Sequence, residues 1–286
     1  MLKNLIISIR LEQWYKNILL FAGIVFSLNI LNISMWATVT LAFIFFCMLS
    51  ASEYLINDIL DRKRDRKHPI KCKRPIASGQ LKVSHAILFA LLLIVVALVG
   101  SYLIVSIEFL IISASYLVLI LLYSLIFRHL VIVDILVIST GFVIRAIAGC
   151  IAISVFVSPW LIVCTFLLAL FLALGKRRHE LVILGDEVEA HRASLSVYST
   201  RTLEQMTDIT TGALIIAYLM YTFLTDNYYM MLTAPFAIYG LFRYLHLVHQ
   251  KDFGGQPEMM FKDKATLINL VIWALLVVLV LYITPG

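Results

Sequence analysis

Three carboxylates with helical spacing are the first residues in the sequence that could perform chemistry. Asp58, Asp61 and Asp65 follow a long apolar run, and their i, i+3, i+7 spacing places them on one face of a helix that continues past that run. Because like charges on one face repel, a cation among them would relieve the repulsion, and Mg²⁺ that bridges to phosphate oxygens suits such a set. The alternative is a solvated helix end whose acids neutralise nearby Arg and Lys.

Basic side chains follow these carboxylates closely. We expect His68-Pro69 to end the helix, since proline disfavours helical geometry at and just before itself. Lys71 and Arg74 come next, on an ordered turn. A guanidinium beside a carboxylate-bound metal fits a diphosphate or another phosphorylated substrate. The alternative is the general enrichment of Lys and Arg in the cytoplasmic loops of membrane proteins.

A second polar run begins at Gly175 and reads Gly-Lys-Arg-Arg-His-Glu-Leu. On a continuing helix Lys176 and Glu180 form an i, i+4 pair. That pair is either a surface salt bridge, worth about 0.3–0.5 kcal/mol, or part of the second wall of one site at membrane level, together with Arg177. The histidines of the chain show no metal-ligand or nucleophile spacing.

The elements that position these residues are expected to be transmembrane helices. Of the 286 residues 62% are hydrophobic and 14% charged, against about 45–50% and about 25% in soluble domains, which excludes a soluble globular protein. The apolar runs are continuous and lack the alternation of an outer-membrane barrel. We count nine, at 18–33, 36–56, 86–107, 109–127, 130–157, 160–174, 209–224, 228–247 and 265–283. The sequence therefore predicts an all-α, polytopic membrane protein, a nine-helix bundle forming a single domain over 1–286 with its active site open to the cytoplasm.

The positions of the charges predict the orientation in the membrane. When the loops are numbered alternately, all but two of the 23 Lys and Arg residues fall on the side that carries the N-terminus, and the exceptions, Arg145 and Arg243, lie inside apolar runs. The positive-inside rule then places the N-terminus in the cytoplasm and, with nine spans of the cytoplasmic membrane, the C-terminus outside. The net charge of +6 thus needs no nucleic-acid partner. The four cysteines have no paired spacing that would indicate disulfides or zinc.

Several runs resemble one family. Asn57, Asp58, Asp61 and Asp65 form NDxxDxxxD, which is similar to the first signature of the UbiA superfamily of intramembrane prenyltransferases. Further runs resemble its polyprenyl-phosphate phosphoribosyltransferase branch: Arg10-x-x-Gln13-Trp14-x-Lys16-Asn17, His68–Gly79, Gly175–Leu181, Arg243-Tyr244, and Gly254–Glu258 with Asp263. Ordinary prenyltransferases resemble one another in a second aspartate-rich element after the sixth span, and the basic run from Lys176 replaces it here.

The resemblance implies a reaction in which polyprenyl phosphate and 5-phosphoribosyl diphosphate give polyprenyl-phosphate 5-phosphoribose and diphosphate. It implies Mg²⁺ held by Asp58 and Asp61 with Asp65 in support, with Asn57 orienting. Lys71 and Arg74 would hold the donor phosphates. The implied catalytic residues are Asp58, Asp61, Lys176 and Glu180, and the implied substrate-binding residues are Lys16, Asn17, Asn57, Lys71, Arg74, Arg177, Tyr198 and Arg243. Lys176 and Arg177 would steer the lipid phosphate, with Glu180 orienting one of them or joining a second metal shell. Membrane lipids complete the expected partners.

Arg145 requires a partner, because a charge deep in the membrane costs about 2.5–3.5 kcal/mol on insertion scales. It either pairs with Glu53 structurally or reaches the site, and we favour the structural role.

Two other functions compete with phosphoribosyl transfer to a polyprenyl phosphate. One is transfer of a polyprenyl diphosphate to an aromatic or other small acceptor, against which the missing second aspartate cluster argues. The other is transport, against which the collection of charges at one face argues.

Overall fold

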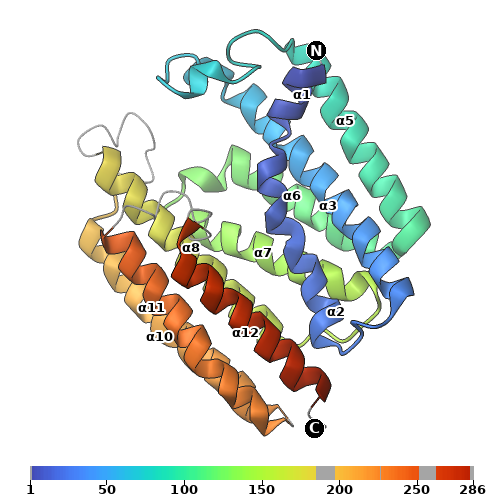
Figure 1. The fold of residues 1–286 in the computed structure, drawn as a ribbon. Helices are drawn as coiled ribbons and strands as arrows, with labels where there is room; N and C mark the ends of the chain where they lie inside the picture. The colour runs from blue at the N-terminus through green and yellow to red at the C-terminus, as the bar shows by residue number, and fades with distance from the viewer. Residues whose placement is uncertain (1, 185–196, 226, 251–261, 284–286) are drawn as a thin grey trace. The chain divides into compact units, whose positions relative to one another are not determined.

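The computed structural model describes residues 2–184, 197–225, 227–250 and 262–283, and within these ranges the chain forms helices and no strand (Figure 1). The all-α prediction is confirmed. The elements in chain order are α1 (Leu2–Ser8), the 3₁₀ helix η1 (Leu11–Phe21), α2 (Ala22–Phe26), α3 (Ile33–Leu60), α4 (Arg62–Asp65), η2 (Lys71–Lys73), α5 (Val83–Gly100), η3 (Ser101–Val105), α6 (Ile107–Leu125), η4 (Phe127–His129), α7 (Val133–Ala152), α8 (Pro159–Leu184), α10 (Thr200–Leu224), η6 (Tyr228–Thr233), α11 (Ala234–Gln250) and α12 (Lys264–Ile283).

The described residues contain eight helices that are long and apolar enough to cross a membrane. They follow the last eight predicted apolar runs in order, and the chain is an integral membrane protein. The first predicted run, 18–33, is not a continuous helix. The 3₁₀ helix η1 passes into the short helix α2, which ends just before Ser27, and a turn follows in which Asn29 Nδ2 donates to Ser27 O at 2.8 Å. Asn32 then caps α3 by accepting from Met35 N at 3.3 Å. The count of nine is therefore not confirmed.

The chain divides into two compact units, Met1–Leu125 with Ile144–Val157, and Ile126–Val143 with Ser158–Gly286. Helix α7 contributes its first half to the second unit and its second half to the first. The expectation of a single domain over 1–286 stays a prediction.

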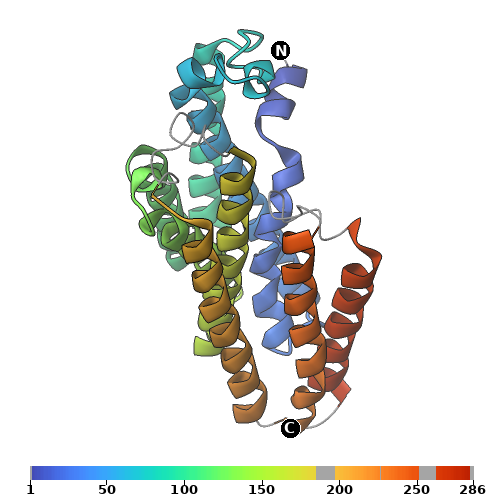
Figure 2. The same cartoon turned by 90° about the vertical axis from the view of Figure 1, so that its left-hand side faces the viewer.

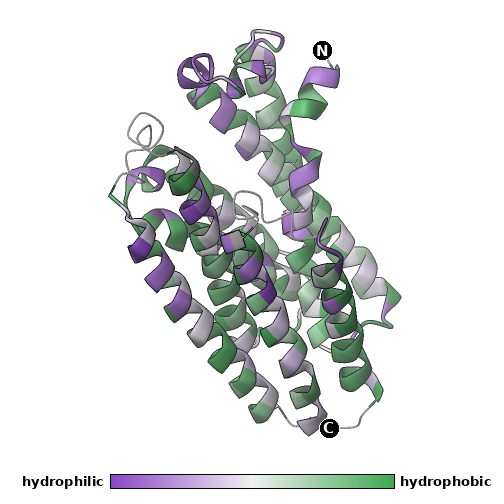
Figure 3. Cartoon of the chain, turned by 60° about the vertical axis from the view of Figure 1, so that its left-hand side comes forward, coloured by the Kyte–Doolittle hydropathy of each residue, from purple (hydrophilic) through white to green (hydrophobic). Residues whose placement is uncertain are grey.

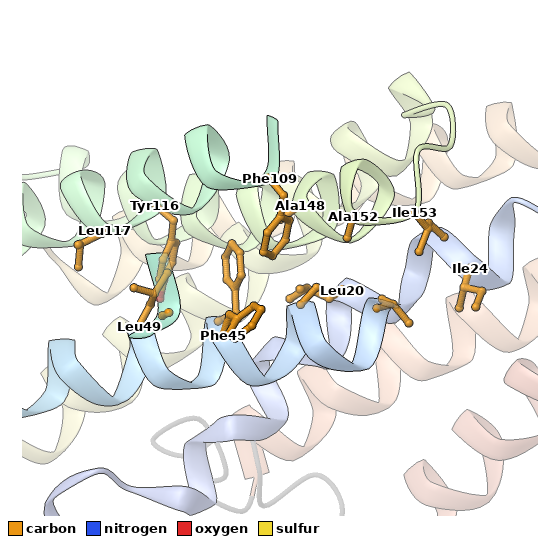
Figure 4. Close-up of a cluster of buried hydrophobic side chains, with 14 of the residues drawn as sticks. Leu20, Ile24, Phe45, Leu49, Phe109, Tyr116, Leu117, Ala148, Ala152 and Ile153 are labelled. Atoms are coloured by element: carbon orange, nitrogen blue, oxygen red, sulfur yellow. The ribbon is translucent and has the colours of Figure 1, made fainter. Parts of the chain in front are cut away.

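The first unit is built around α3, which packs against α5 and η1. Its core contains Phe46, which lies within 5.7 Å of the Phe109 ring and 5.2 Å of the Tyr116 ring, centroid to centroid. Figure 4 shows this cluster, with side chains from η1, α3, α6 and the end of α7 pointing toward one another. Gly149 is required here, because a Cβ on it would collide with the carbonyl of Leu20. The end of α3 from which the polar residues emerge packs in a second buried cluster, around Leu55.

The second unit packs α8 against α10, and α11 against α12. Figure 2 shows α11 and α12 running side by side. Ser199 caps α10 by accepting from Thr202 N at 3.0 Å, and Leu174 of α8 is buried with Leu203 of α10. The long helices of both units are mainly hydrophobic, whereas hydrophilic residues gather where α3 ends and in the loop that follows it (Figure 3).

Candidate active site

The carboxylates predicted from the sequence lie at the end of α3 in the first unit. Asp58 belongs to the last turn of α3, Asp61 joins α3 to α4, and Asp65 ends α4. Asp61 N donates to Asn57 O at 2.9 Å and Asp65 N donates to Asp61 O at 2.8 Å, so helical hydrogen bonding continues across the joint. As a result Asp58 and Asp65 lie on one side and share Arg74, whereas Asp61, which was expected on the same face, pairs with Arg64. Asp58 and Asp65 are almost fully buried, with 2% and 3% of their surfaces exposed.

Arg74 joins these two buried carboxylates. Its Nη1 donates to Asp65 Oδ2 at 2.7 Å and to Asp58 Oδ1 at 3.1 Å. Asp61 is more exposed, and its Oδ1 accepts from Arg64 Nη2 at 3.3 Å. The structure thus brings together Asp58, Asp65 and Arg74, which the sequence singled out, while Asp61 pairs with a surface arginine.

A second guanidinium reaches Asp58 from the start of the chain. Arg10 Nη2 donates to Asp58 Oδ1 at 2.5 Å, and its guanidinium carbon lies 4.8 Å from the centroid of the Tyr54 ring. Arg10 occupies the left-handed region, with φ 49° and ψ 62°, at the joint between α1 and η1. The sequence suggested Arg10 only as part of a family-like run, because nothing local indicates a partner 48 residues away.

The oxygen donors at the end of α3 fit a hard divalent cation. Among the described residues no group of three or more His, Cys, Asp or Glu side chains is gathered as a metal cluster. Asp58 and Asp65 nevertheless offer oxygens to one shared positive group, and Asn57 Oδ1 is buried with no hydrogen-bond partner. Carboxylate and amide oxygens are the ligands that Mg²⁺ prefers. The residues present therefore offer the oxygen donors that suit Mg²⁺.

The loop after α4 is ordered by His68 and presents Lys71. The His68 Nδ1 accepts from the backbone N of Ile70 at 3.1 Å and of Lys71 at 3.3 Å, which fixes the turn after the helix break. Lys71 lies in the short helix η2 with an exposed side chain. His68 therefore shapes the loop, and Lys71 is accessible from solvent.

Asn17 lies in a buried polar network rather than at a surface. Its Oδ1 accepts from Arg145 Nε at 2.8 Å, and Arg145 Nη2 donates to Tyr116 OH at 2.6 Å. Tyr116 OH in turn donates to Glu53 Oε2 at 3.4 Å. Arg145 and Glu53, which we expected to pair, are thus linked through Tyr116, and the structural role favoured for Arg145 fits these contacts. Lys16 is half-buried, with its ammonium 6.0 Å from the Tyr15 ring centroid.

The second unit holds the other predicted cluster, at the end of α8. Lys176 is exposed, whereas Arg177 is 3% exposed. Arg177 Nε donates to Asp134 Oδ2 at 3.0 Å and its Nη1 donates to Glu180 Oε2 at 2.6 Å. The expected orienting contact between Glu180 and a cation is present, and Arg177 is that cation. Asp134 was not predicted, although a lone acid within an apolar run was a usable indication.

Two further candidates in the second unit have structural partners. Tyr198 OH accepts from Ile132 N at 2.6 Å and is buried. Arg243 holds Asp263 with two bonds, Nε to Oδ2 at 3.1 Å and Nη2 to Oδ1 at 2.9 Å. These bonds from Arg243, with a further one from the Thr266 backbone N, hold the pKa of Asp263 below its usual range. The run Gly254–Glu258 lies outside the described residues.

Buried carboxylates joined to guanidiniums thus lie on apolar helices that are long enough to span a membrane. The family model of the UbiA prenyltransferase family matches residues 18–262. The chain belongs to this family and is an enzyme of the prenyltransferase type, which confirms the resemblance drawn from the sequence.

Curated relatives align over nearly the whole chain. The decaprenyl-phosphate phosphoribosyltransferase of Corynebacterium glutamicum is 31% identical over 99% of this chain and 88% of that enzyme. The enzyme of the same name from Mycolicibacterium smegmatis is 31% identical over 96% of this chain and 91% of its own length. That of Mycobacterium tuberculosis is 30% identical over 93% and 90%.

Solved structures share the fold. A UbiA homolog from Archaeoglobus fulgidus bound to DMAPP and Mg²⁺ aligns with a TM-score of 0.71 and 16% identity, covering 97% of this chain and 98% of that one. The same homolog bound to GPP and Mg²⁺ gives a TM-score of 0.72 and 15% identity, over 98% and 97%. At these identities the likeness establishes the fold alone.

Proposed function

We propose that this enzyme transfers 5-phosphoribose from 5-phosphoribosyl diphosphate to a polyprenyl phosphate. The observation that carries the proposal is 31% identity over 99% of the chain to an enzyme named decaprenyl-phosphate phosphoribosyltransferase. The exposed Lys176, where ordinary prenyltransferases resemble one another in a second aspartate cluster, agrees with it. A cation at that position suits an acceptor that is itself a phosphate.

In the first unit we assign the diphosphate leaving group to the end of α3. Asp58, Asp61 and Asp65, with Asn57, would hold Mg²⁺, which when bound neutralises the charge that develops on the diphosphate. Asp61 pairs with Arg64, whose side chain is 52% exposed, and a surface pair of this kind is worth about 0–1 kcal/mol, so breaking this pair costs little.

Arg74 and Lys71 would bind the phosphates of the sugar donor. The Arg74 guanidinium already lies between Asp58 and Asp65, and its planar fork matches phosphate oxygens in two-point contact. Lys71 is exposed on the ordered turn beyond it and offers a point charge.

In the second unit we assign the lipid phosphate to Lys176. Its exposed ammonium can meet a headgroup, whereas the guanidinium of Arg177 is buried and held by Asp134 and Glu180. Arg177 therefore acts as a positioning residue for Glu180, in place of the direct phosphate contact expected from the sequence. Lys16, Asn17, Tyr198 and Arg243 remain candidates for substrate binding, with Asn17, Tyr198 and Arg243 held by protein partners.

The bond changes follow from the charges of the two substrates. An oxygen of the lipid phosphate forms a bond to C1 of the ribose as the bond from C1 to the diphosphate oxygen breaks, and diphosphate leaves with the bonding electrons. Because the acceptor phosphate is an anion near pH 7, the step requires no strong general base. Positioning and electrostatic stabilisation supply most of the rate.

The proposed orientation has the N-terminus and the end of α3 on the cytoplasmic side of the cytoplasmic membrane, where 5-phosphoribosyl diphosphate, a soluble anion, is expected. The partly exposed Cys72, next to Lys71, gives a direct test. An impermeant thiol reagent should label Cys72 in inverted vesicles and fail to label it in intact cells. Labelling from outside would overturn this orientation.

Transfer itself is tested with purified protein in vesicles that contain decaprenyl phosphate. Labelled 5-phosphoribosyl diphosphate should give a lipid-soluble product and an equal amount of diphosphate. If the protein instead consumed a polyprenyl diphosphate with an aromatic acceptor and ignored 5-phosphoribosyl diphosphate, the alternative function would stand.

A further inference from the structure

We propose that Arg10 is a stored phosphate ligand. It neutralises Asp58 while no metal is bound, and it passes to the oxygens of the diphosphate when a divalent cation takes Asp58. The inference rests on the proposed function, since it takes Asp58 as a metal ligand. It assigns to the N-terminal segment a part in binding the donor substrate.

The charges at the end of α3 are balanced without a metal. Two buried carboxylates, Asp58 and Asp65, face two guanidiniums, those of Arg10 and Arg74. Both arginines converge on a single atom, Asp58 Oδ1, at 2.5 Å and 3.1 Å. A buried carboxylate without a counter-charge is strongly destabilising, and these two arginines supply the counter-charge from the protein itself.

Because of this balance, a divalent cation alone should bind only weakly at the end of α3. Adding Mg²⁺ to two carboxylates and two guanidiniums leaves two excess positive charges at short range, and the ion must compete with Arg10 for Asp58 Oδ1. A diphosphate brings the missing negative charge and gives the displaced guanidinium an acceptor. Metal and diphosphate should therefore bind cooperatively, each favouring the other.

Arg10 is the arginine that can leave. Arg74 is held by both carboxylates, whereas Arg10 donates to Asp58 alone and its side chain is 25% exposed. Its left-handed backbone, φ 49°, is disfavoured for a residue with a Cβ, so the contact with Asp58 is made from a strained joint. The Tyr54 ring, 4.8 Å from the guanidinium, can support the cation during the exchange.

The test uses the full-length protein in detergent and two variants. Arg10→Asn removes the charge but keeps a residue that tolerates the left-handed backbone, and Arg10→Lys keeps the charge without the fork. Arg128→Asn, in the short helix η4 of the second unit, removes the same charge elsewhere and serves as the matched control. Free Mn²⁺ is followed by its paramagnetic resonance signal, with and without inorganic diphosphate.

Arg10→Asn should bind Mn²⁺ alone about three- to tenfold more tightly than the wild type, because a competing cation is gone. With Mn²⁺ saturating, the same variant should bind inorganic diphosphate about tenfold more weakly, because a charge-assisted ligand is lost. Arg10→Lys should lie between, and Arg128→Asn should match the wild type. These opposite changes distinguish a stored ligand from a structural residue, whose loss would weaken both.

Equal weakening of both affinities by Arg10→Asn, or no change in either, would overturn the inference while leaving the metal assignment standing. If the wild type bound no Mn²⁺ even with diphosphate present, the metal assignment in the proposed function would fail instead. Should Arg10→Asn not fold, as judged by size-exclusion chromatography, Arg10→Lys carries the test through its weaker binding of diphosphate with unimpaired binding of Mn²⁺.

Discussion

The buried ion pair between Arg177 and Asp134 provides a prediction whose size can be worked out from the structure. The two side chains are 4% and 1% exposed, and they join α8 to the start of α7 within the second unit. Replacing Asp134 by Leu keeps a similar shape but removes a buried counter-charge from Arg177, which still donates to Glu180, whose side chain is 28% exposed. Removing one partner of a buried pair costs about 3–5 kcal/mol, and the remaining acceptor places this case near 3.

For a protein of this size, about 3 kcal/mol corresponds to a fall in Tm of about 6–12 °C. Thermal unfolding in detergent, followed by fluorescence, measures the shift for Asp134→Leu and for Arg177→Met. The double variant Asp134→Leu with Arg177→Met removes both charges and leaves Glu180 to solvent. It should recover most of the lost stability, since a buried pair replaced by apolar side chains of similar volume is often neutral.

An Asp134→Leu variant with the Tm of the wild type would contradict the burial argument. A double variant whose fall in Tm equals the sum of the falls in the two single variants would contradict it as well. Because Arg177 also holds Glu180, the double variant should remain folded yet lose activity. Retained full activity would refute the positioning role of Arg177.

Three more outcomes are expected. Asp58→Asn should abolish turnover and leave the protein folded, since the amide keeps the shape and removes the charge that binds metal; retained Mg²⁺-dependent turnover would contradict the metal assignment. Lys176→Ala should raise KM for polyprenyl phosphate more than for 5-phosphoribosyl diphosphate, and Arg74→Ala the reverse, in paired saturation curves at fixed Mg²⁺. Arg243 lowers the pKa of Asp263, so their pair stabilises the fold above the usual aspartate pKa of about 3.9 and ceases to do so as the pH falls. The Tm of Arg243→Gln should accordingly lie below that of the wild type at pH 7 and approach it below about pH 4.

What could be predicted from the sequence was set by local spacing. The i, i+7 relation of Asp58 and Asp65 survives the joint at Asp61, because helical hydrogen bonds cross it, and both carboxylates accept from Arg74, a contact that the spacing did not predict. The last eight apolar runs correspond to helices because each is long enough and apolar enough to span a membrane, even where it contains a charged residue such as Arg145. The first run is not confirmed as a span for a local reason as well, since Ser27 and Asn29 form a turn within it.

What could not be predicted depends on contacts between distant parts of the chain. Nothing near Arg10 indicates that it meets Asp58, 48 residues later. Adjacent basic residues look alike in a sequence, yet Arg177 is buried because Asp134, 43 residues earlier, lies against it, while its neighbour Lys176 is exposed. Which charges neutralise one another and which remain available for substrate is decided by packing, which residue spacing does not encode.

The central claim is the transfer of phosphoribose to a lipid phosphate, and one measurement tests it most directly. Purified protein in vesicles with decaprenyl phosphate and Mg²⁺ is given 5-phosphoribosyl diphosphate labelled in the ribose, and the lipid product is identified by mass spectrometry. The proposal predicts a product that carries the intact 5-phosphoribosyl group on the lipid phosphate, one diphosphate released for each, and none with Asp58→Asn. A wild-type protein that leaves labelled ribose in the aqueous phase, while joining a polyprenyl group from its diphosphate to an aromatic acceptor, would contradict it.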